Sequence, residues 1–325
     1  MRKNKTLTLE YIAPIPDVPI GYTYVSAGVS NKREGLFLFI KNDPKGEVHG
    51  RHSKLRMGKS KDFLLVIQDD RAREDIFITD IDFTFPVFDV FPDRRVLIAA
   101  SRCAWGMGDK YLLNGLIYDP KTGERTLFLA GDGIESLAIN SKSHIFISYY
   151  DEGVFGNNGW EGQGIEGPGV GGVTCFDDTG EVLWQHNKTA NMEDGSFISD
   201  CYALNVSGSD AYYYFYTDFL LAKTNSKFET TLWRTSMSGC HCFAISRDAI
   251  LFSGQYDDDL GNEFYLMRRT PNKLTRQTKI YAKLSKGYMS DPSQTIGRGW
   301  NIHYFNKDGW FRGSIYTLLQ LFDTE

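Results

Sequence analysis

The residues with the clearest chemical potential are carboxylates that follow short apolar segments at several places in the chain. Asp151 ends the segment SLAINSKSHIFISYYD, Asp218 ends CYALNVSGSDAYYYFYTD, and Asp257 ends CFAISRDAILFSGQYD. Carboxylates gathered on one surface can pair with lysine and arginine side chains of a partner, or can hold a divalent cation. Aspartate also favours the transition from strand to turn, so each of these residues has a purely structural alternative.

The segments that carry these carboxylates share one pattern, which is a short apolar strand, a polar turn, a second apolar or aromatic strand, and an aspartate. The copies begin near residues 87, 136, 201 and 242. Their spacing of about 40 to 65 residues is typical of β-propeller blades. Aromatic residues make up 14% of the chain, and runs such as YYYFY at 212–216 favour pleated sheets.

We therefore predict an all-β fold, a β-propeller that forms a single domain over residues 1–325. The most consistent count is six four-stranded blades, with seven as the alternative. The first blade is expected to use strands at 22–28, 35–41, 62–68 and 75–81. The last stretch, 294–325, is too short for a blade, and its segments IGRGWNIHYF and WFRGSIYTLLQLF supply two or three strands. The N-terminal segment TLTLEYI (6–12) would add the missing outer strand and close the fold.

Two insertions interrupt the strand pattern, a basic one at 43–61 and a glycine-rich one at 151–172. In a propeller, connections from second to third strands emerge on the same face as connections between blades. That face should carry both insertions and an acidic rim. The expected rim residues are Asp43, Asp109, Asp132, Glu135, Asp151, Glu193, Asp194, Asp218 and Asp257.

Phe155 and Trp160 are large apolar residues flanked by glycines in the second insertion. They can anchor a partner, or they can pack the loop onto its own blade. We predict a partner-binding surface on this face of the protein. Its residues are Asp151, Glu152, Phe155, Trp160, Glu161, Asp218, Tyr256, Asp257, Asp258 and Asp259.

Signals for catalysis and for cofactors are weak. Strand alternation would place Cys240 and Cys242 on one face and His241 on the other, so the three should not converge on a metal ion. The sequence has no GxSxG elbow, Walker loop or HExxH motif. We expect no cofactor, no metal and no catalytic residues. The enzyme alternative is a metal-dependent hydrolase of the sugar-lactonase propeller type, with ligands drawn from Asp151, Glu152, Asp200 and Asp218.

Composition limits the classes of partner. The net charge of −5 and a pI near 5.8 argue against a direct nucleic-acid binder. His49 and His52 lie among basic residues that could bind phosphate, although a solvated loop is the favoured interpretation. MRKNKTLTLEY lacks the apolar core of a secretory signal, and no apolar run is long enough to span a membrane. The five cysteines are expected to be reduced thiols in the cytoplasm.

Three phrases, SYYDEGVFGNNGW (148–160), ISDCYALNV (198–206) and YYFYTDFLL (213–221), carry a family resemblance. They resemble a family of uncharacterised bacterial β-propeller proteins over residues 134–222, which implies the same fold and a bacterial cytosolic setting. More weakly, the chain resembles propeller-type immunity proteins of bacterial toxin systems. This second resemblance implies a non-catalytic protein that binds and inhibits a nuclease toxin. Its basic partner would meet the acidic rim.

Overall fold

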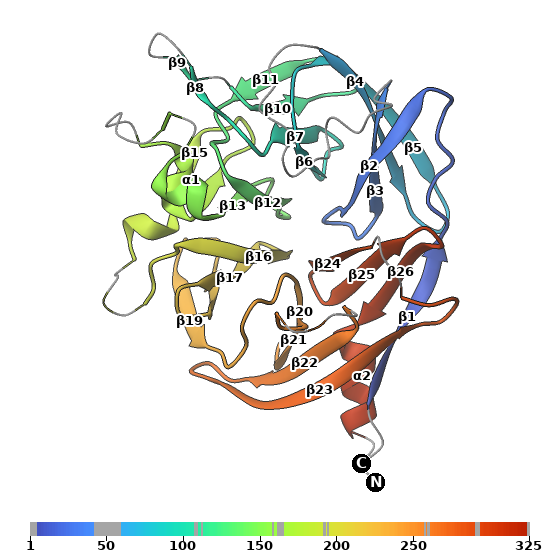
Figure 1. The fold of residues 1–325 in the computed structure, drawn as a ribbon, viewed down its shortest axis with the longest axis vertical. Helices are drawn as coiled ribbons and strands as arrows, with labels where there is room; N and C mark the ends of the chain where they lie inside the picture. The colour runs from blue at the N-terminus through green and yellow to red at the C-terminus, as the bar shows by residue number, and fades with distance from the viewer. Residues whose placement is uncertain are drawn as a thin grey trace. The chain divides into compact units, whose positions relative to one another are not determined.

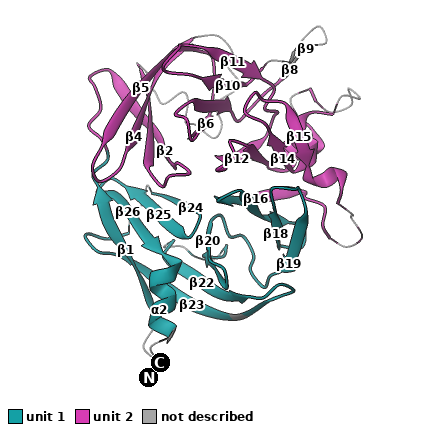
Figure 2. Cartoon of the chain, turned by 180° about the vertical axis from the view of Figure 1, so that it is seen from behind, with its two compact units in different colours: residues 1–15, 202–325 teal, residues 16–201 magenta. Residues whose placement is uncertain are grey.

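The computed structural model describes residues 5–41, 60–106, 110–111, 113–157, 159–160, 166–190, 193, 195–256, 258, 261–289 and 293–323. The chain divides into two compact units, shown in different colours in Figure 2. Unit 1 contains residues 1–15 and 202–325, and unit 2 contains residues 16–201.

Unit 2 contains three antiparallel sheets of four strands, which Figure 1 shows in blue to green. Each strand pairs with the next one of its sheet. The first sheet is β2 (Tyr22–Val29), β3 (Gly35–Lys41), β4 (Lys61–Gln68) and β5 (Arg73–Ile81). The second is β6 (Pro86–Val90), β7 (Val96–Ala100), β10 (Gly115–Tyr118) and β11 (Arg125–Phe128). The third is β12 (Ile134–Ile139), β13 (Ile145–Tyr149), β14 (Val173–Phe176) and β15 (Val182–Gln185). The two long insertions fall in the β3–β4 and β13–β14 connections. A separate ribbon pairs β8 (Trp105–Gly106) with β9 (Lys110–Tyr111).

Unit 1 contains a four-stranded sheet and an eight-stranded sheet. The smaller sheet is β16 (Asp200–Ser207), β17 (Asp210–Tyr216), β18 (Leu220–Thr224) and β19 (Thr230–Arg234), of which β16 begins at the boundary with unit 2. The larger sheet joins two sets of four strands. One set is β20 (Phe243–Ile245), β21 (Ala249–Ser253), β22 (Glu263–Arg269) and β23 (Leu274–Leu284). The other is β24 (Gln294–Arg298), β25 (Asn301–Asn306), β26 (Gly309–Ser314) and β1 (Thr6–Ala13).

The N-terminal strand β1 joins the two sets of the eight-stranded sheet. It pairs with β26 in the antiparallel sense, where Glu10 faces Arg312, and with β23 in the parallel sense, where Thr6 faces Tyr281. In Figure 1 the blue β1 lies beside the red β26. Leu7 and Leu9 are buried in an apolar core with residues of β20 to β23, β25 and β26. The prediction that the N-terminal strand completes the last set is confirmed.

Repeated four-stranded antiparallel meanders confirm the predicted fold class, an all-β protein of the β-propeller type. All four strands expected in the first blade are present, with bounds that differ by no more than two residues. The count of six blades and the single-domain assignment remain predictions. No helix among the described residues has the length and apolarity needed to cross a membrane.

The stretch 294–325 supplies three strands, β24, β25 and β26, within the expected two or three, and it ends in a helix that was not predicted. Residues of IYTLLQLF form the helix α2 (Ile315–Asp323). Ile315 and Leu318 are fully buried, and Leu319 and Phe322 pack against the same core. Their spacing of three and four residues matches the helical period and not the alternation of a strand, so one face of the helix covers the core.

Leu9 provides a test of the role of β1. Replacing this fully buried side chain with alanine should lower the free energy of unfolding by about 2 to 5 kcal/mol, because it leaves a cavity beside β26. Urea denaturation followed by tyrosine and tryptophan fluorescence measures the change. Glu10→Ala, an exposed position on the same strand, is the control and should differ little from wild type. Equal destabilisation by both variants would contradict the role given to Leu9.

Candidate functional site

The predicted contact residues fall into separate places in the two units. Asp151, Glu152, Phe155 and Trp160 belong to unit 2, whereas Asp218, Tyr256 and Asp258 belong to unit 1. Glu161, Asp257 and Asp259 lie outside the described residues, as do the rim candidates Asp43, Asp109 and Asp194 and the basic segment 43–59.

The glycine-rich insertion of unit 2 is held close to its own sheet. It begins with the short helix α1 (Asp151–Phe155) and returns through the 3-10 turn η1 (Pro168–Gly171). Gly153 and Gly169 sit where backbones touch. A Cβ on Gly153 would overlap the Asp132 carbonyl, and one on Gly169 would overlap the Gly153 carbonyl. The glycines thus serve close backbone packing, and, as expected, the described residues between β13 and β14 contain no strand.

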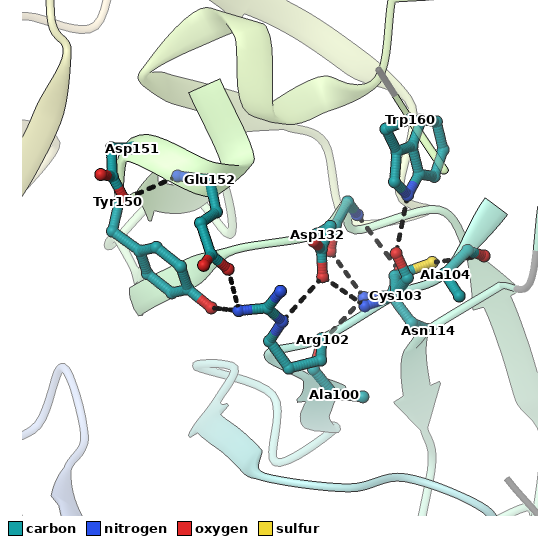
Figure 3. A network of polar contacts seen from close by, with 11 residues as sticks. Ala100, Arg102, Cys103, Ala104, Asn114, Asp132, Tyr150, Asp151, Glu152 and Trp160 are labelled. Carbon is teal, nitrogen blue, oxygen red and sulfur yellow. Dashed lines mark hydrogen bonds and ion pairs between the residues drawn. The ribbon is translucent and has the colours of Figure 1, made fainter. Parts of the chain in front are cut away.

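One arginine ties α1 to the connection that follows β7. Arg102 Nη1 donates hydrogen bonds to the Tyr150 hydroxyl at 2.5 Å and to the Glu152 carboxylate, and Nε lies 3.2 Å from Asp132 Oδ1. Figure 3 shows these contacts. We call Arg102, Asp132, Tyr150 and Glu152 the Arg102 network. Burial would lower the pKa of Arg102, but the two carboxylates outweigh it and raise the pKa, so the guanidinium stays charged.

The Arg102 network continues inward to Trp160. The Asp132 carboxylate accepts the Cys103 backbone N–H at 2.7 Å, and Trp160 Nε1 donates to the Cys103 carbonyl at 2.6 Å. Trp160 is only 8% exposed, and Asp132 is 4% exposed. Of the two alternatives for Trp160, the structure therefore shows packing within its own unit. Asp132 was expected on an acidic rim, and this was wrong because its carboxylate is buried as the partner of Arg102.

The exposed part of α1 carries one aromatic ring and one carboxylate, and a second carboxylate, Asp200 at the start of β16, lies nearby. Phe155 is 60% exposed, and its ring lies 6.3 Å from that of Phe197. Asp151 is exposed at the first position of the helix. Burial, together with the negative charge of Asp151, raises the pKa of Asp200 to about 6. The two carboxylates therefore repel each other, and a cation placed near them would be favoured.

In unit 1, five aromatic residues from three segments form one continuous group. We call Tyr202, Tyr214, Tyr216, Phe219 and Tyr256 the aromatic cluster. Tyr202 stacks on Tyr216 with ring centroids 6.4 Å apart and 9° between the planes. Phe219 meets Tyr216 edge to face at 5.5 Å and Tyr256 at 6.4 Å. The Tyr256 hydroxyl donates to the Tyr202 hydroxyl at 2.8 Å.

The aromatic cluster reaches from the core of unit 1 to its surface. Tyr214 is fully buried and donates its hydroxyl to the Met237 carbonyl at 2.8 Å, and burial raises its pKa. Tyr202 and Phe219 are partly buried against the same core. Tyr216 is 41% exposed and Tyr256 is 63% exposed. The outer rings are therefore partly open to solvent, while the inner ring is anchored in the core.

Two carboxylates stand beside the outer rings. Asp218 lies in the β17–β18 turn between Tyr216 and Phe219, and Arg234 Nη1 approaches it at 3.6 Å on the exposed surface. Asp258 lies in the turn that holds Tyr256, where Asp258 Oδ2 accepts the Glu263 N–H at 3.0 Å. The structure thus groups three of the predicted contact residues of unit 1 with aromatic residues that were not predicted.

The proposed ligands of the hydrolase alternative are distributed differently. Asp151 and Asp200 interact with each other, but Glu152 is bound to Arg102, and Asp218 belongs to unit 1. In the described part of the chain, no three histidine, cysteine, aspartate or glutamate side chains come together as metal ligands. Cys240 and Cys242 are buried and His241 is exposed, as alternation predicted, although β20 begins only at Phe243.

Unit 2 also contains a cavity of about 260 Å³ beside Arg102. Its apolar walls come from Ile81, Phe83, Ala100, Ala104, Leu113, Leu116 and Leu127. Its charged residues are Asp80, Asp82, Arg102 and Arg125, so the lining has no net charge. Asn114, also in the lining, uses its amide for hydrogen bonds to backbone groups of Ala100, Ala130 and Gly131. The polar atoms of the Asn114 side chain are therefore already used in hydrogen bonds within the protein.

The chain is similar in sequence to one protein family and in fold to several solved structures. The sequence model of the YxzG family matches residues 173–277. No curated protein sequence matches the chain. Among solved structures, the chain is similar to virginiamycin B lyase from Staphylococcus aureus, at 8% identity and a TM-score of 0.47, over 89% of this chain and 94% of that one. It is also similar to BamB from Moraxella catarrhalis, at 12% identity and a TM-score of 0.44, over 94% of this chain and 85% of that one.

A further similar structure is the β-propeller domain of the Trilobed protease from Pyrococcus furiosus. The identity is 12% and the TM-score 0.42, over 91% of this chain and 80% of that one. Similarity at this level says nothing about a shared activity.

The Arg102 network predicts a defined pattern of stability changes. Arg102→Met should lower the free energy of unfolding by about 3 to 5 kcal/mol, because the Asp132 carboxylate, which is buried, would lose its cation. The double variant Arg102→Met/Asp132→Asn should recover part of that loss, since the uncompensated charge is gone. Urea denaturation of the four proteins of this cycle measures both effects. A single variant that unfolds at the wild-type urea concentration would show that the network does not hold α1.

The raised pKa of Asp200 predicts a dependence of stability on pH. Because the folded state holds this proton more tightly, with a pKa of about 6 against 3.8, the free energy of unfolding should fall as pH rises from about 4 to about 6. Asp200→Asn should flatten this fall and be more stable than wild type at pH 7. Asp151→Asn should flatten it partly. Thermal melts at several pH values measure the effect, with Glu181→Gln as an exposed control in the same unit. Parallel profiles for wild type and Asp200→Asn would refute the assignment.

Proposed function

We propose that this chain is a non-catalytic cytoplasmic protein that works by binding another protein. Its partner would be a basic protein, and the specific role we favour is that of an immunity protein which binds and inhibits a nuclease toxin. The observation that carries the proposal is the pairing of exposed aromatic rings with exposed carboxylates, Phe155 with Asp151 in unit 2 and Tyr216 with Asp218 in unit 1.

The chemistry of these surfaces is that of protein interfaces. Tyrosine and phenylalanine are enriched in the buried centre of interfaces, where they contribute much of the binding energy. In unit 1 the outer rings belong to the aromatic cluster, so their positions are fixed before a partner arrives, which reduces the entropy lost on binding. Within each sheet these residues lie on connections after second strands, namely β13–β14, β17–β18 and β21–β22.

Charge supports a basic partner. The chain carries a net charge of −5, and the carboxylates of Asp151 and Asp200 repel each other, so a neighbouring lysine or arginine would relieve that repulsion. Nucleases bind the phosphates of their substrates through basic clefts. An acidic protein can occupy such a cleft in place of phosphate, and opposite charges accelerate the encounter.

The experiment has two stages. A photoreactive phenylalanine analogue placed at Phe155 or at Tyr256 in the native cell should cross-link the same basic protein from both positions, whereas the analogue placed at Phe37, which is fully buried, should not. The captured protein is then purified and assayed for nuclease activity with and without the chain. A captured protein that is acidic, or whose activity the chain leaves unchanged, would overturn the inhibitor role.

Charge reversal tests the two surfaces separately. Asp151→Lys and Asp218→Lys should each weaken binding of the captured protein by about tenfold or more, because like charges would meet in the complex. Asp70→Lys is the matched control, since Asp70 is exposed in the β4–β5 turn at the opposite end of its sheet from the second-to-third-strand connections. Calorimetric titration measures the affinities. If both reversed variants bind as wild type does, these surfaces are not the interface.

A further inference from the structure

We infer that the aromatic cluster of unit 1 is a binding site for an arginine side chain of the bound protein. The inference rests on the proposed function and goes further, because it names the chemical group that this surface recognises.

The rings offer the kind of surface on which a guanidinium stacks. Tyr202 and Tyr216 are nearly parallel, with 9° between their planes, and Tyr256 stands at 78° to Tyr202. Tyr216 and Tyr256 are 41% and 63% exposed, so part of each ring is open to solvent. A cation over the face of a tyrosine is attracted by the negative electrostatic potential of the ring.

The outer rings are also held in place by the fold. A Cβ at Gly239 would overlap the Tyr256 ring, so the ring rests directly on this glycine, whose φ is +76°. Phe219 adopts a φ of 52°, a conformation that side chains other than glycine rarely take, and this turn places its ring between Tyr216 and Tyr256. This backbone conformation, which costs free energy, fixes the direction in which the Phe219 ring leaves the turn.

Carboxylates supply the complementary charge. Asp218 precedes Phe219 directly, and Asp258 is in the same turn as Tyr256. Arg234 already lies 3.6 Å from Asp218, but both side chains are exposed, at 73% and 43%. An exposed pair at this distance contributes little free energy, so an arginine from a partner can replace it. The aromatic faces and the acidic groups together favour a cation over a phosphate.

Arginine suits this surface better than lysine does. Its guanidinium is planar, stacks on aromatic rings, and can still donate hydrogen bonds from its edge to a carboxylate such as that of Asp218. A lysine ammonium is more strongly hydrated and loses more on leaving water. The expected gain is about two- to fivefold in affinity for each exposed ring that the guanidinium contacts.

The test uses the full chain and two labelled probes, octa-arginine and octa-lysine peptides, with binding measured by fluorescence anisotropy. Octa-arginine should bind several-fold more tightly than octa-lysine, and Tyr256→Leu and Tyr216→Leu should each reduce that preference. Tyr256→Phe should keep it, because the ring remains and only the hydroxyl is lost. Tyr288→Leu is the control. Tyr288 is in the same unit, is 86% exposed, and is not part of the cluster.

Each other outcome overturns the inference in a recognisable way. If both peptides bind equally and Asp218→Asn weakens both alike, the partner can still be basic, but the cluster is not an arginine-binding site. An arginine preference that survives in the double variant Tyr216→Leu/Tyr256→Leu would place it elsewhere on the chain. Binding of an oligothymidine probe that is lost with Tyr256 would make the cluster a stacking site for bases. If neither peptide binds, the cluster is not an arginine-binding site. The cross-linking experiment at Phe155 and Tyr256 would still test the proposed function independently.

Discussion

The eight-stranded sheet of unit 1 depends on the backbone pairing of β1 with β26 and β23. Without β1, the outer edges of two neighbouring four-stranded sets would be open, and the core beneath Leu7 and Leu9 would be exposed. The alternation of TLTLEYIA places its leucines inward, so one short strand both completes a sheet and covers a core. The aromatic cluster draws its rings from strands β16 and β17 and from the β17–β18 and β21–β22 connections, so it rests on both sheets of this unit.

In unit 2, an arginine side chain holds the glycine-rich insertion against its sheet. The glycines of 151–172 allow backbones to approach closely, but close approach alone does not choose one arrangement. Arg102 makes that choice, because its one guanidinium binds Asp132 on the sheet side and Glu152 on α1. As a result, Phe155 and Asp151 remain on the surface while Trp160 is turned inward. The exposed chemistry of this unit is therefore a consequence of a partly buried ion pair.

Sequence patterns predicted the strands well, because strand alternation is local and each strand could be recognised from its own residues. The same reasoning missed α2, where apolar spacing of three and four residues follows directly after a strand pattern. It could not decide the position of Trp160, because the carbonyl that accepts its N–H belongs to Cys103, which is distant in sequence.

In the candidate site too, residues recognisable from local sequence were predicted, and contacts between distant residues were not. Asp218 and Tyr256 were predicted from their place after second strands. The aromatic cluster was not, although YYYFY suggested a crowded sheet, because Tyr202, Phe219 and Tyr256 meet only after three connections fold together. Arg102 belongs to no motif, and its two carboxylate partners are separated from it along the chain. Contacts of that kind are set by topology, and a single sequence does not display them.

The position of β1 also has a consequence for the order of events during synthesis. Its partner strand β26 is made long after it, since Glu10 pairs with Arg312, so β1 must wait for a distant part of the chain before it can dock. During that interval the apolar face of β1 has no native cover, and the edges of β23 and β26 are open to other chains. Long-range pairing of this kind slows folding. Slow translation or a shortage of chaperones should therefore affect the yield of this protein more than its final stability.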